Sequence, residues 1–245
     1  MRLPGSRESG SWRPQTFNFW YSMISFFYRH RAFFLPFGLL WLGVGYIQFF
    51  YSQNYIIVSI NRLWTPAQDW IFSFMTFLGD GIFVIGMVLL FAWFSIKKGT
   101  LILAGYVFSG IIVQLSKHFV FPDAHRPARV MENILPWLHT VSGVAMYQNG
   151  SFPSGHTTSA FALFAMLAFF NSSMPYKLFF LLLALLVAYS RMYLLQHYLL
   201  DVHMGAFLGT GTAALLYYLS EKKVLPRLDT WENRGLRELL SKKES

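Results

Sequence analysis

Six apolar runs, separated by short polar segments, constrain most strongly what this chain can fold into. The runs are residues 32–51, 81–96, 100–121, 153–170, 178–196 and 199–219. A helix that crosses a bilayer needs about 20 predominantly apolar residues, and most of these runs approach or reach that length. The pattern therefore predicts an all-α fold, a six-transmembrane-helix bundle.

The composition supports a membrane protein and excludes several functional classes. Of the 245 residues, 55% are hydrophobic and only 13% are charged, whereas soluble domains carry about 25% charged residues. The net charge of +9 could indicate nucleic-acid binding, but the basic residues lie in tails and short loops without interleaved aromatic residues. We therefore expect no nucleic-acid partner. The absence of cysteine excludes a disulfide, a zinc–thiolate site and a cysteine nucleophile.

Three regions are expected along the chain. Residues 1–31 form a basic, aromatic segment that is too polar for a cleaved signal peptide and is typical of an interfacial or cytoplasmic N-terminus. Residues 32–219 form the membrane domain, and residues 220–245 form a charged cytoplasmic tail. The segment 52–80, after the first span, is too polar to cross and predicts one or two short amphipathic helices at the far interface.

The basic residues predict the orientation in the membrane. With six crossings both termini lie on the same side, and only five of the 20 Lys and Arg residues fall on the other side: Arg62, Lys117, Arg126, Arg129 and Arg191. Basic residues favour the cytoplasmic side, so both termini are expected there. If residues 54–78 also crossed, the orientation of everything after them would invert.

Ionisable residues interrupt the apolar sequence between the last two runs. Charged groups at membrane depth are costly and usually face a protein interior or a watery cavity. His197 and Asp201 are four residues apart, which on a helix places them on one face, where the carboxylate can orient the imidazole. Such an imidazole can be a base or a nucleophile. The alternative is a buried ion pair between transmembrane helices, with Arg191 nearby.

Two further polar patches lie at the ends of runs on the same side. The first is Lys117, followed by Arg126-Pro127, and the second is Pro153–His156, at the start of the fourth run. Pro-Ser-Gly suits a helix start, where backbone N–H groups can hold an anion. Basic side chains around such a helix start would form a pocket for a dianion, and two histidines would be available for attack and proton donation. The pattern indicates phosphate chemistry without a metal.

Together these patches resemble the three-part signature of the type 2 phosphatidic acid phosphatase and vanadium haloperoxidase superfamily. The parts are Lys117…Arg126-Pro127, Pro153-Ser154-Gly155-His156, and Ser190-Arg191…His197…Asp201. The second and third parts match in residue type and spacing. The first departs, because eight residues separate Lys117 from Arg126 where the family usually has six. The resemblance covers residues 100–219, and six spans suit the membrane branch of the family.

The resemblance implies a role for each residue. His197 would attack phosphorus and carry a phosphohistidine, Asp201 would hold its imidazole, and His156 would protonate the leaving oxygen. The residues expected to bind the phosphoryl oxygens are Lys117, Arg126, Ser154, Gly155 and Arg191. Neither a metal nor a cofactor is implied, and vanadate should inhibit.

We therefore expect a lipid phosphatase at the outer face of a bacterial inner membrane. Its substrate would be a lipid phosphomonoester or pyrophosphate, such as undecaprenyl pyrophosphate, phosphatidic acid, phosphatidylglycerol phosphate or a lipid A phosphate. One alternative is a lipid phosphotransferase that uses the same histidine. Others are a transporter with an ion relay through the bundle and a catalytically inactive lipid-binding relative. The sequence selects neither the lipid nor the oligomeric state.

Overall fold

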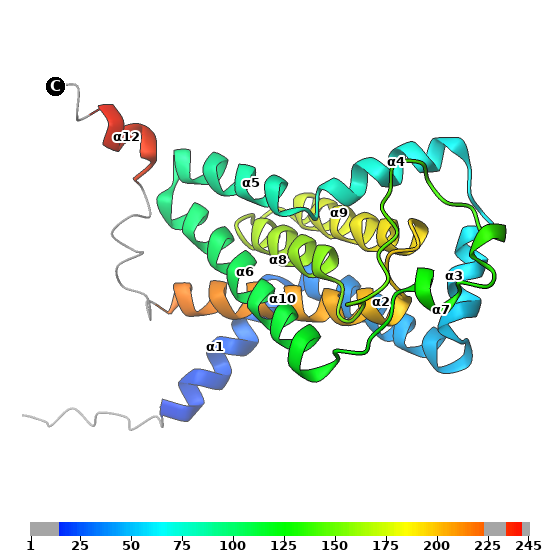
Figure 1. The fold of residues 1–245 in the computed structure, drawn as a ribbon. Helices are drawn as coiled ribbons and strands as arrows, with labels where there is room; N and C mark the ends of the chain where they lie inside the picture. Colours follow the sequence, from blue (N-terminus) through cyan, green and yellow to red (C-terminus); the bar gives the residue numbers. More distant parts are fainter. Residues whose placement is uncertain (1–14, 223–233, 242–245) are drawn as a thin grey trace, which may run out of the picture.

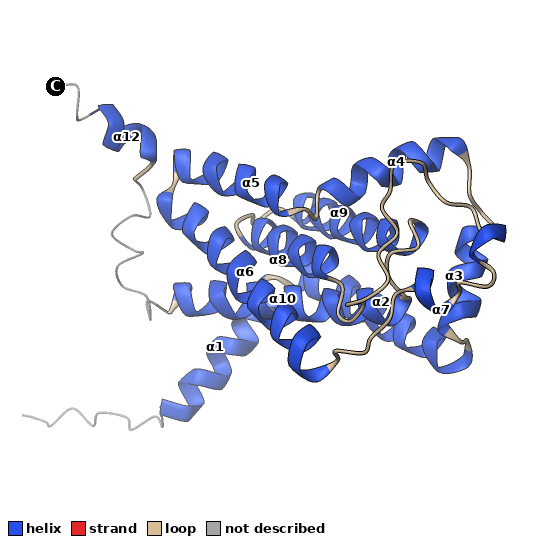
Figure 2. Cartoon of the chain, viewed as in Figure 1, coloured by secondary structure: helices blue, strands red, loops and turns tan. Residues whose placement is uncertain are grey.

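The computed structural model describes residues 15–222 and 234–241, and this part of the chain consists of helices and loops (Figure 2). One isolated antiparallel bridge joins His125 to Asn149. The α-helices in chain order are α1 Gln15–Arg29, α2 Arg31–Phe50, α3 Gln53–Asn61, α4 Pro66–Phe77, α5 Gly81–Phe94, α6 Ile96–Leu115, α7 Pro127–Val130, α8 Gly155–Phe169, α9 Met174–Tyr193, α10 Leu199–Glu221 and α12 Leu236–Ser241 (Figure 1). The all-α prediction is confirmed for the described residues.

Several of these helices are long and apolar enough to cross a membrane. Four qualify alone: α2, α6 with the π-helical turn that follows it (η1, Ser116–Val120), α9 and α10. A fifth span forms if α4 and α5, which meet at a bend of 56°, are taken together. The remaining apolar helix, α8, has 15 residues, or about 23 Å of helix. The protein is therefore an integral membrane protein with four or five candidate spans, and the count of six stays a prediction.

The segment 52–80 forms two helices that belong to the bundle. Ser52 caps α3, and Thr65 caps α4, which has Pro66 in its first turn. Helix α4 packs on α9, where the ring of Phe72 lies 4.8 Å from that of Tyr193. Whether this segment lies at the membrane interface stays a prediction, as do the domain limits 1–31, 32–219 and 220–245, which fall partly on residues outside the described ranges.

Helices α6 and α9 both begin a few residues before the apolar runs 100–121 and 178–196. Ser95 caps α6 by accepting a hydrogen bond from the N–H of Lys98, so residues 97–99 form the first turn of that helix. Gly99 allows α5 and α6 to pack closely where they connect, because a Cβ at position 99 would lie 2.6 Å from the Cβ of Ala92. Lys177 likewise lies within α9, which begins at Met174.

Helix α8 is the core of the bundle, and α10 packs directly against it. Nearly every side chain of α8 from Thr157 to Phe169 is buried, including four phenylalanine and methionine side chains. Gly205 and Gly209 of α10, spaced as in the small-residue pattern that lets helices approach closely, face this helix. A Cβ on Gly205 would lie 2.9 Å from the carbonyl oxygen of Ser154. The close approach fixes the start of α8 beside the start of α10.

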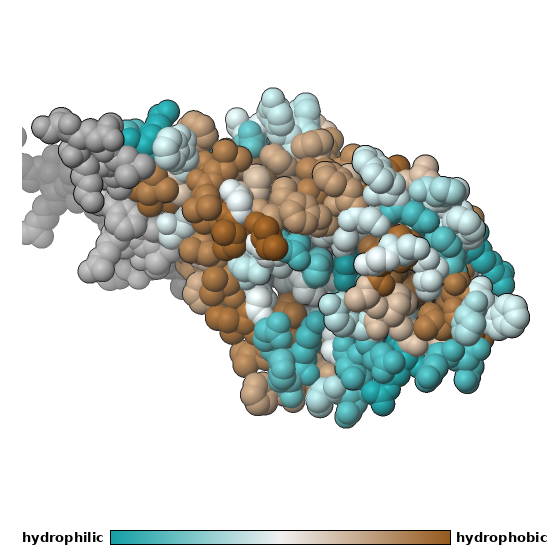
Figure 3. All heavy atoms as spheres, turned by 45° about the horizontal axis from the view of Figure 1, so that its top comes forward, coloured by the Kyte–Doolittle hydropathy of each residue, from teal (hydrophilic) through white to brown (hydrophobic). Residues whose placement is uncertain are grey.

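The two ends of the bundle differ in character. The start of α6, the end of α10 and helices α1 and α12 lie at one end, and the long loop between α6 and α8 lies at the other (Figure 1). In the space-filling view, hydrophobic residues cover the α5–α6 side, while hydrophilic residues gather over the long-loop end (Figure 3). The polar residues singled out in the sequence lie at this second end.

We expect Gly209→Ala to destabilise the protein. The new Cβ would lie 2.3 Å from the carbonyl oxygen of Thr158, and overpacking of this kind costs about 1–3 kcal/mol. Gly211→Ala is the matched control, because nothing lies within 4 Å of a Cβ at that position on the same helix. Thermal unfolding in detergent should show a lower Tm for Gly209→Ala alone. Equal Tm values for the two variants would contradict the close packing of α8 and α10.

Candidate active site

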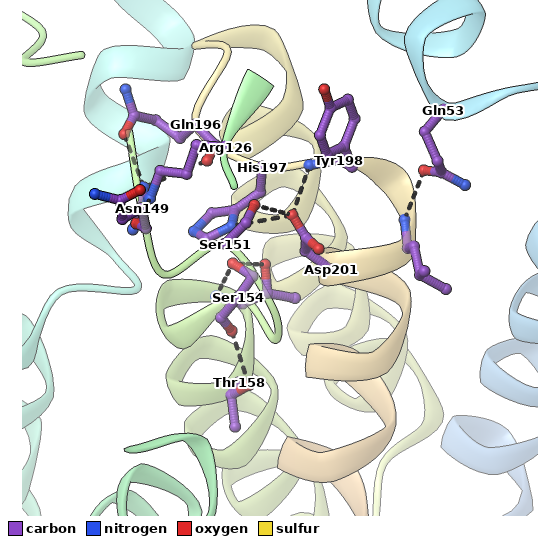
Figure 4. Close-up of polar contacts among 12 residues, drawn as sticks. Gln53, Arg126, Asn149, Ser151, Ser154, Thr158, Gln196, His197, Tyr198 and Asp201 are labelled. Carbon is purple, nitrogen blue, oxygen red and sulfur yellow. Dashed lines mark hydrogen bonds and ion pairs between the residues drawn. The ribbon is translucent and has the colours of Figure 1, made fainter. Parts of the chain in front are cut away.

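The candidate site forms where the α9–α10 turn meets the start of α8 and the long loop. Figure 4 shows Ser154, His197 and Asp201 close together, with Arg126 reaching toward them from the long loop. The Ser154 N–H donates a hydrogen bond of 3.0 Å to the backbone carbonyl of Asp201. Two helix starts that are distant in the sequence are thereby joined by their backbones.

The α9–α10 turn sets the position of His197. The N–H groups of Gln196 and His197 both bond to the carbonyl of Arg191, which closes the end of α9. Leu195 adopts a left-handed conformation with φ of 54° and is fully buried. Helix α10 begins at Leu199 after the cap residue Tyr198. His197 therefore lies just before the helix, so its expected placement with Asp201 on one helix face was wrong, although the two side chains do approach.

The carboxylate of Asp201 is held from three sides. Its Oδ2 accepts hydrogen bonds from the Ser151 hydroxyl at 2.5 Å and from the Tyr198 N–H at 2.8 Å (Figure 4). The Nδ1 of His197 lies 3.4 Å from the same oxygen. The contact does not form a hydrogen bond, and Nδ1 has no hydrogen-bond partner within the described residues. Asp201 is thus placed to orient the imidazole.

Arg126 is fixed over the site by acceptors from two loops. Its Nε donates to the carbonyl of Asn149 at 2.9 Å, and one terminal nitrogen donates to the carbonyl and side-chain oxygens of Gln196 at 3.3 and 3.1 Å (Figure 4). Its guanidinium also lies over the ring of Tyr147. Neither Gln196 nor Asn149 stood out in the sequence, although Gln196 directly precedes the expected nucleophile.

Arg191 and Lys117 bring two more positive charges to the same place. Arg191 is buried in α9 and donates one hydrogen bond to the Thr76 hydroxyl, while its Nε has no partner within the described chain. Lys117 lies in η1, with its side chain near Gly150. The π-helical turn η1 includes the first part of the stretch from Lys117 to Arg126, which is two residues longer than in the family signature. Lys117 still reaches the site despite the two additional residues.

These charges act on His197. Burial, first, and then the nearby positive charges of Arg191, Arg126 and Lys117 hold the pKa of His197 well below its usual value. At neutral pH the imidazole is therefore unprotonated, with a lone pair available for attack. The same crowding of positive charge favours a bound anion, which would relieve it.

The start of α8 provides the other half of the site. Ser154 caps this helix, and its hydroxyl accepts a hydrogen bond from the Thr157 hydroxyl at 3.0 Å. Pro153 directly precedes this cap residue. The first-turn N–H groups of Gly155 and His156 have no partner inside the helix by position. Because the Ser154 N–H bonds to Asp201, these two groups are the ones that could hold an anion.

Asp80 also lies beside the residues of the site. It caps α5 through a hydrogen bond from the Ile82 N–H, and its Oδ2 lies 3.8 Å from the Nε2 of His156. Gly79 permits this approach, because a Cβ there would lie 2.6 Å from the carbonyl oxygen of His156. A cavity of about 470 Å³ is lined by His156 and Asp80 and lies between α6 and α8, beside the start of α5.

The other histidines have different partners. His139 bonds to Asp69 and stacks on Trp64, and His203 bonds to Gln48 and to the carbonyl of Trp41. Within the described residues, no three His, Asp or Glu side chains cluster as metal ligands. All eight residues expected from the sequence lie at one end of the bundle.

Comparisons with known proteins agree with the family resemblance of the sequence motifs. The sequence model of the PAP2 superfamily matches residues 98–225, which contain all eight residues. The crystal structure of Aquifex aeolicus LpxE is similar with a TM-score of 0.58 and 25% identity, over 66% of this chain and 92% of that one. A PAP2 type phosphatidylglycerolphosphate phosphatase from Bacillus subtilis is similar in fold, with a TM-score of 0.58 and 21% identity, over 80% of this chain and 97% of that one. No curated protein matches the chain.

We expect Arg126→Gln to raise the pKa of His197. The substitution removes a positive charge that disfavours the imidazolium, so the pKa should move up toward its usual value. Titration of labelled histidine by NMR in detergent measures this shift. Arg129→Gln is the control, because its guanidinium bonds to Asn149 but does not act on His197. A wild-type pKa at or above about 6.5, or equal shifts in both variants, would contradict the electrostatics described.

Proposed function

Because the chain belongs to the PAP2 superfamily, we propose that it is an integral membrane lipid phosphatase that works through a phosphohistidine. The observation that carries the proposal is one buried, unprotonated histidine beside a fixed carboxylate and three cationic side chains. Phosphoryl transfer relies on positioned charge of this kind, which stabilises the oxygens of the transferred group.

The proposed reaction has two steps. In the first, the Nε2 of His197, whose Nδ1 faces Asp201, attacks phosphorus. The bond between phosphorus and the ester oxygen breaks, and His156 gives a proton to the leaving oxygen. In the second, His156 takes a proton from water, which attacks phosphorus and breaks the P–N bond. Phosphate leaves and His197 is regenerated.

The remaining residues would bind the phosphoryl oxygens. Lys117, Arg126 and Arg191 provide the positive charge, and the unpartnered Nε of Arg191 is a donor available to an oxygen. Ser154 and the backbone N–H groups at Gly155 and His156 complete the cradle. We infer that Asp80 positions His156 as the proton donor, because its carboxylate lies 3.8 Å from that imidazole. No metal takes part in this scheme.

We propose a lipid as the substrate because of where the site opens. The cavity beside His156 lies between α6 and α8, next to the start of α5, and reaches Val107 and Gly110 of α6, a helix on the hydrophobic side of the molecule (Figure 3). A lipid chain could stay in the bilayer there while its phosphate reaches His197. The relative from Bacillus subtilis is described as acting on phosphatidylglycerolphosphate. Phosphatidic acid, undecaprenyl pyrophosphate and lipid A phosphates are further candidates.

We also propose that the site faces away from the cytoplasm. Six crossings and the excess of Lys and Arg at the end with both termini support this orientation. The protein would then act at the outer face of a bacterial inner membrane, on lipids of that leaflet.

Phosphate release from a panel of lipid phosphates in detergent tests the proposal. We expect metal-independent release in EDTA by the wild type, inhibition by vanadate, and a loss of at least about a thousandfold in His197→Ala, since removal of a nucleophile abolishes its covalent route. His118→Ala is the matched control, because this exposed histidine adjoins Lys117 and bonds only to the backbone of its own helix among the described residues.

Analysis of the products and of the variant distinguishes a phosphatase from the alternatives. Transfer of the phosphoryl group to a second lipid without free phosphate would assign a phosphotransferase. Undiminished release by His197→Ala would exclude the proposed nucleophile. No turnover of any lipid by the folded protein would overturn the phosphatase assignment for those substrates.

A further inference from the structure

The side chain of Gln196 has no role in the proposed mechanism, although it directly precedes the proposed nucleophile. It lies in the turn between α9 and α10 and is only 2% exposed. A buried amide is costly unless it is hydrogen-bonded, and a long, flexible side chain loses conformational freedom when it is fixed. The hydrogen-bond partners of this amide therefore indicate what the residue does.

The amide nitrogen of Gln196 faces two backbone carbonyls. Its Nε2 donates to the carbonyl of Ala145 at 2.9 Å and to the carbonyl of Leu194 at 3.3 Å. Carbonyl oxygens only accept hydrogen bonds, so these contacts require the NH2 group of the amide at this place. Ala145 belongs to the long loop and Leu194 to the α9–α10 turn. The amide therefore joins these two segments, and its own orientation is fixed.

The amide oxygen of Gln196 faces Arg126. One terminal nitrogen of Arg126 donates to this oxygen at 3.1 Å and to the backbone carbonyl of Gln196 at 3.3 Å (Figure 4). The Nε of Arg126 donates to the carbonyl of Asn149. The protein thus holds two of the three guanidinium nitrogens, and the other terminal nitrogen has no hydrogen-bond partner among the described residues.

The acceptors that hold Arg126 are all neutral. They are two backbone carbonyls and one amide oxygen, and no carboxylate bonds to this arginine in the described part of the chain. A neutral acceptor fixes the direction of a guanidinium without cancelling its charge. A carboxylate would instead form a salt bridge and use the paired donors that a phosphate needs. The arrangement keeps Arg126 oriented and its charge available to an anion.

The same segment also fixes the proposed nucleophile. The N–H groups of Gln196 and His197 bond to one carbonyl, that of Arg191, at 2.9 and 3.2 Å. A displacement of this segment would therefore move the imidazole and the acceptors of Arg126 together.

We propose that Gln196 is a positioning residue, whose neutral amide ties the long loop to the α9–α10 turn and directs Arg126 toward the phosphoryl group. This role rests on the proposed function, in which Arg126 binds the phosphoryl oxygens. It also explains why an amide occupies the position. The nitrogen satisfies two carbonyls, and the oxygen holds an arginine that must keep its charge for the substrate.

Two substitutions change the amide in different ways. Gln196→Met removes the acceptor for Arg126 and the link to Ala145 at similar side-chain length. Gln196→Glu keeps an acceptor, but it adds a negative charge and turns an oxygen toward the two carbonyls. We expect kcat/KM for lipid phosphate release to fall by about tenfold or more in both variants, since a hydrogen bond to a charged group is worth that much. The rise in KM should be larger for Gln196→Glu, because its charge offsets that of Arg126.

The pKa of His197, titrated by NMR of labelled histidine in detergent, gives a readout that needs no turnover. Burial first, and then positive charges that include Arg126, lower this pKa. A displaced Arg126 should therefore raise it in Gln196→Met, and the added carboxylate should raise it further in Gln196→Glu. If Gln196 acts through Arg126, then Arg126→Gln and Arg126→Gln/Gln196→Met should have the same pKa.

Gln148→Met is the matched control. This glutamine is exposed in the same loop, and its side chain has no hydrogen bond among the described residues. The substitution should leave both KM and the pKa of His197 at their wild-type values. If Gln196→Met fails to fold, Gln196→Asn, which keeps the amide but shortens its reach, replaces it in every comparison.

The outcomes distinguish the positioning role from the proposed function. Wild-type KM and an unchanged pKa of His197 in folded Gln196→Met would overturn the positioning role, even if its Tm is lower, and would leave the phosphatase assignment standing. Additive pKa shifts in Arg126→Gln and Gln196→Met would overturn it as well. No turnover of any lipid phosphate by the wild type, with the expected pKa shifts present, would contradict the proposed function but support the contact of Gln196 with Arg126.

Discussion

The candidate active site depends on the interactions of one residue, Asp201. Its backbone carbonyl accepts from the Ser154 N–H, and its carboxylate accepts from Ser151 and Tyr198 and faces His197. One aspartate therefore joins the start of α8, the start of α10 and the loop before α8. Because each of these elements carries a proposed functional group, a displaced Asp201 would separate the imidazole from the anion cradle as well as lose its orientation.

The packing of the helices sets the distances that these short-range contacts require. Gly205 and Gly209 bring α10 onto the buried helix α8, which sets the spacing of the two helix starts. The helices and the long loop then hold Lys117, Arg126 and Arg191 near a buried imidazole, although like charges repel one another. On the proposed mechanism, a fold that already holds this unfavourable charge in place would bind a dianion without reorganising.

Much of this arrangement could be predicted from local sequence, and the rest depends on packing between segments that are distant in the sequence. The apolar runs predicted helices α2, α5, α6, α8, α9 and α10 to within a few residues. The signature predicted residues that the fold brings to one end of the bundle, and most of them interrupt or border apolar runs. Asp80 could not be linked to His156, since the α4–α5 bend alone brings them together. Gln196 and Asn149 act through Arg126, and nothing in their own neighbourhoods indicates that contact.

The most direct measurement is identification of the phosphorylated residue. Rapid acid-free quenching of the protein during turnover of a radiolabelled lipid phosphate, followed by peptide mapping, locates the label. The account predicts an acid-labile, base-stable phosphoryl group on the peptide that contains His197, and its absence in His197→Ala. Label on another residue, or continued turnover by His197→Ala without any phosphorylated protein, would contradict the account.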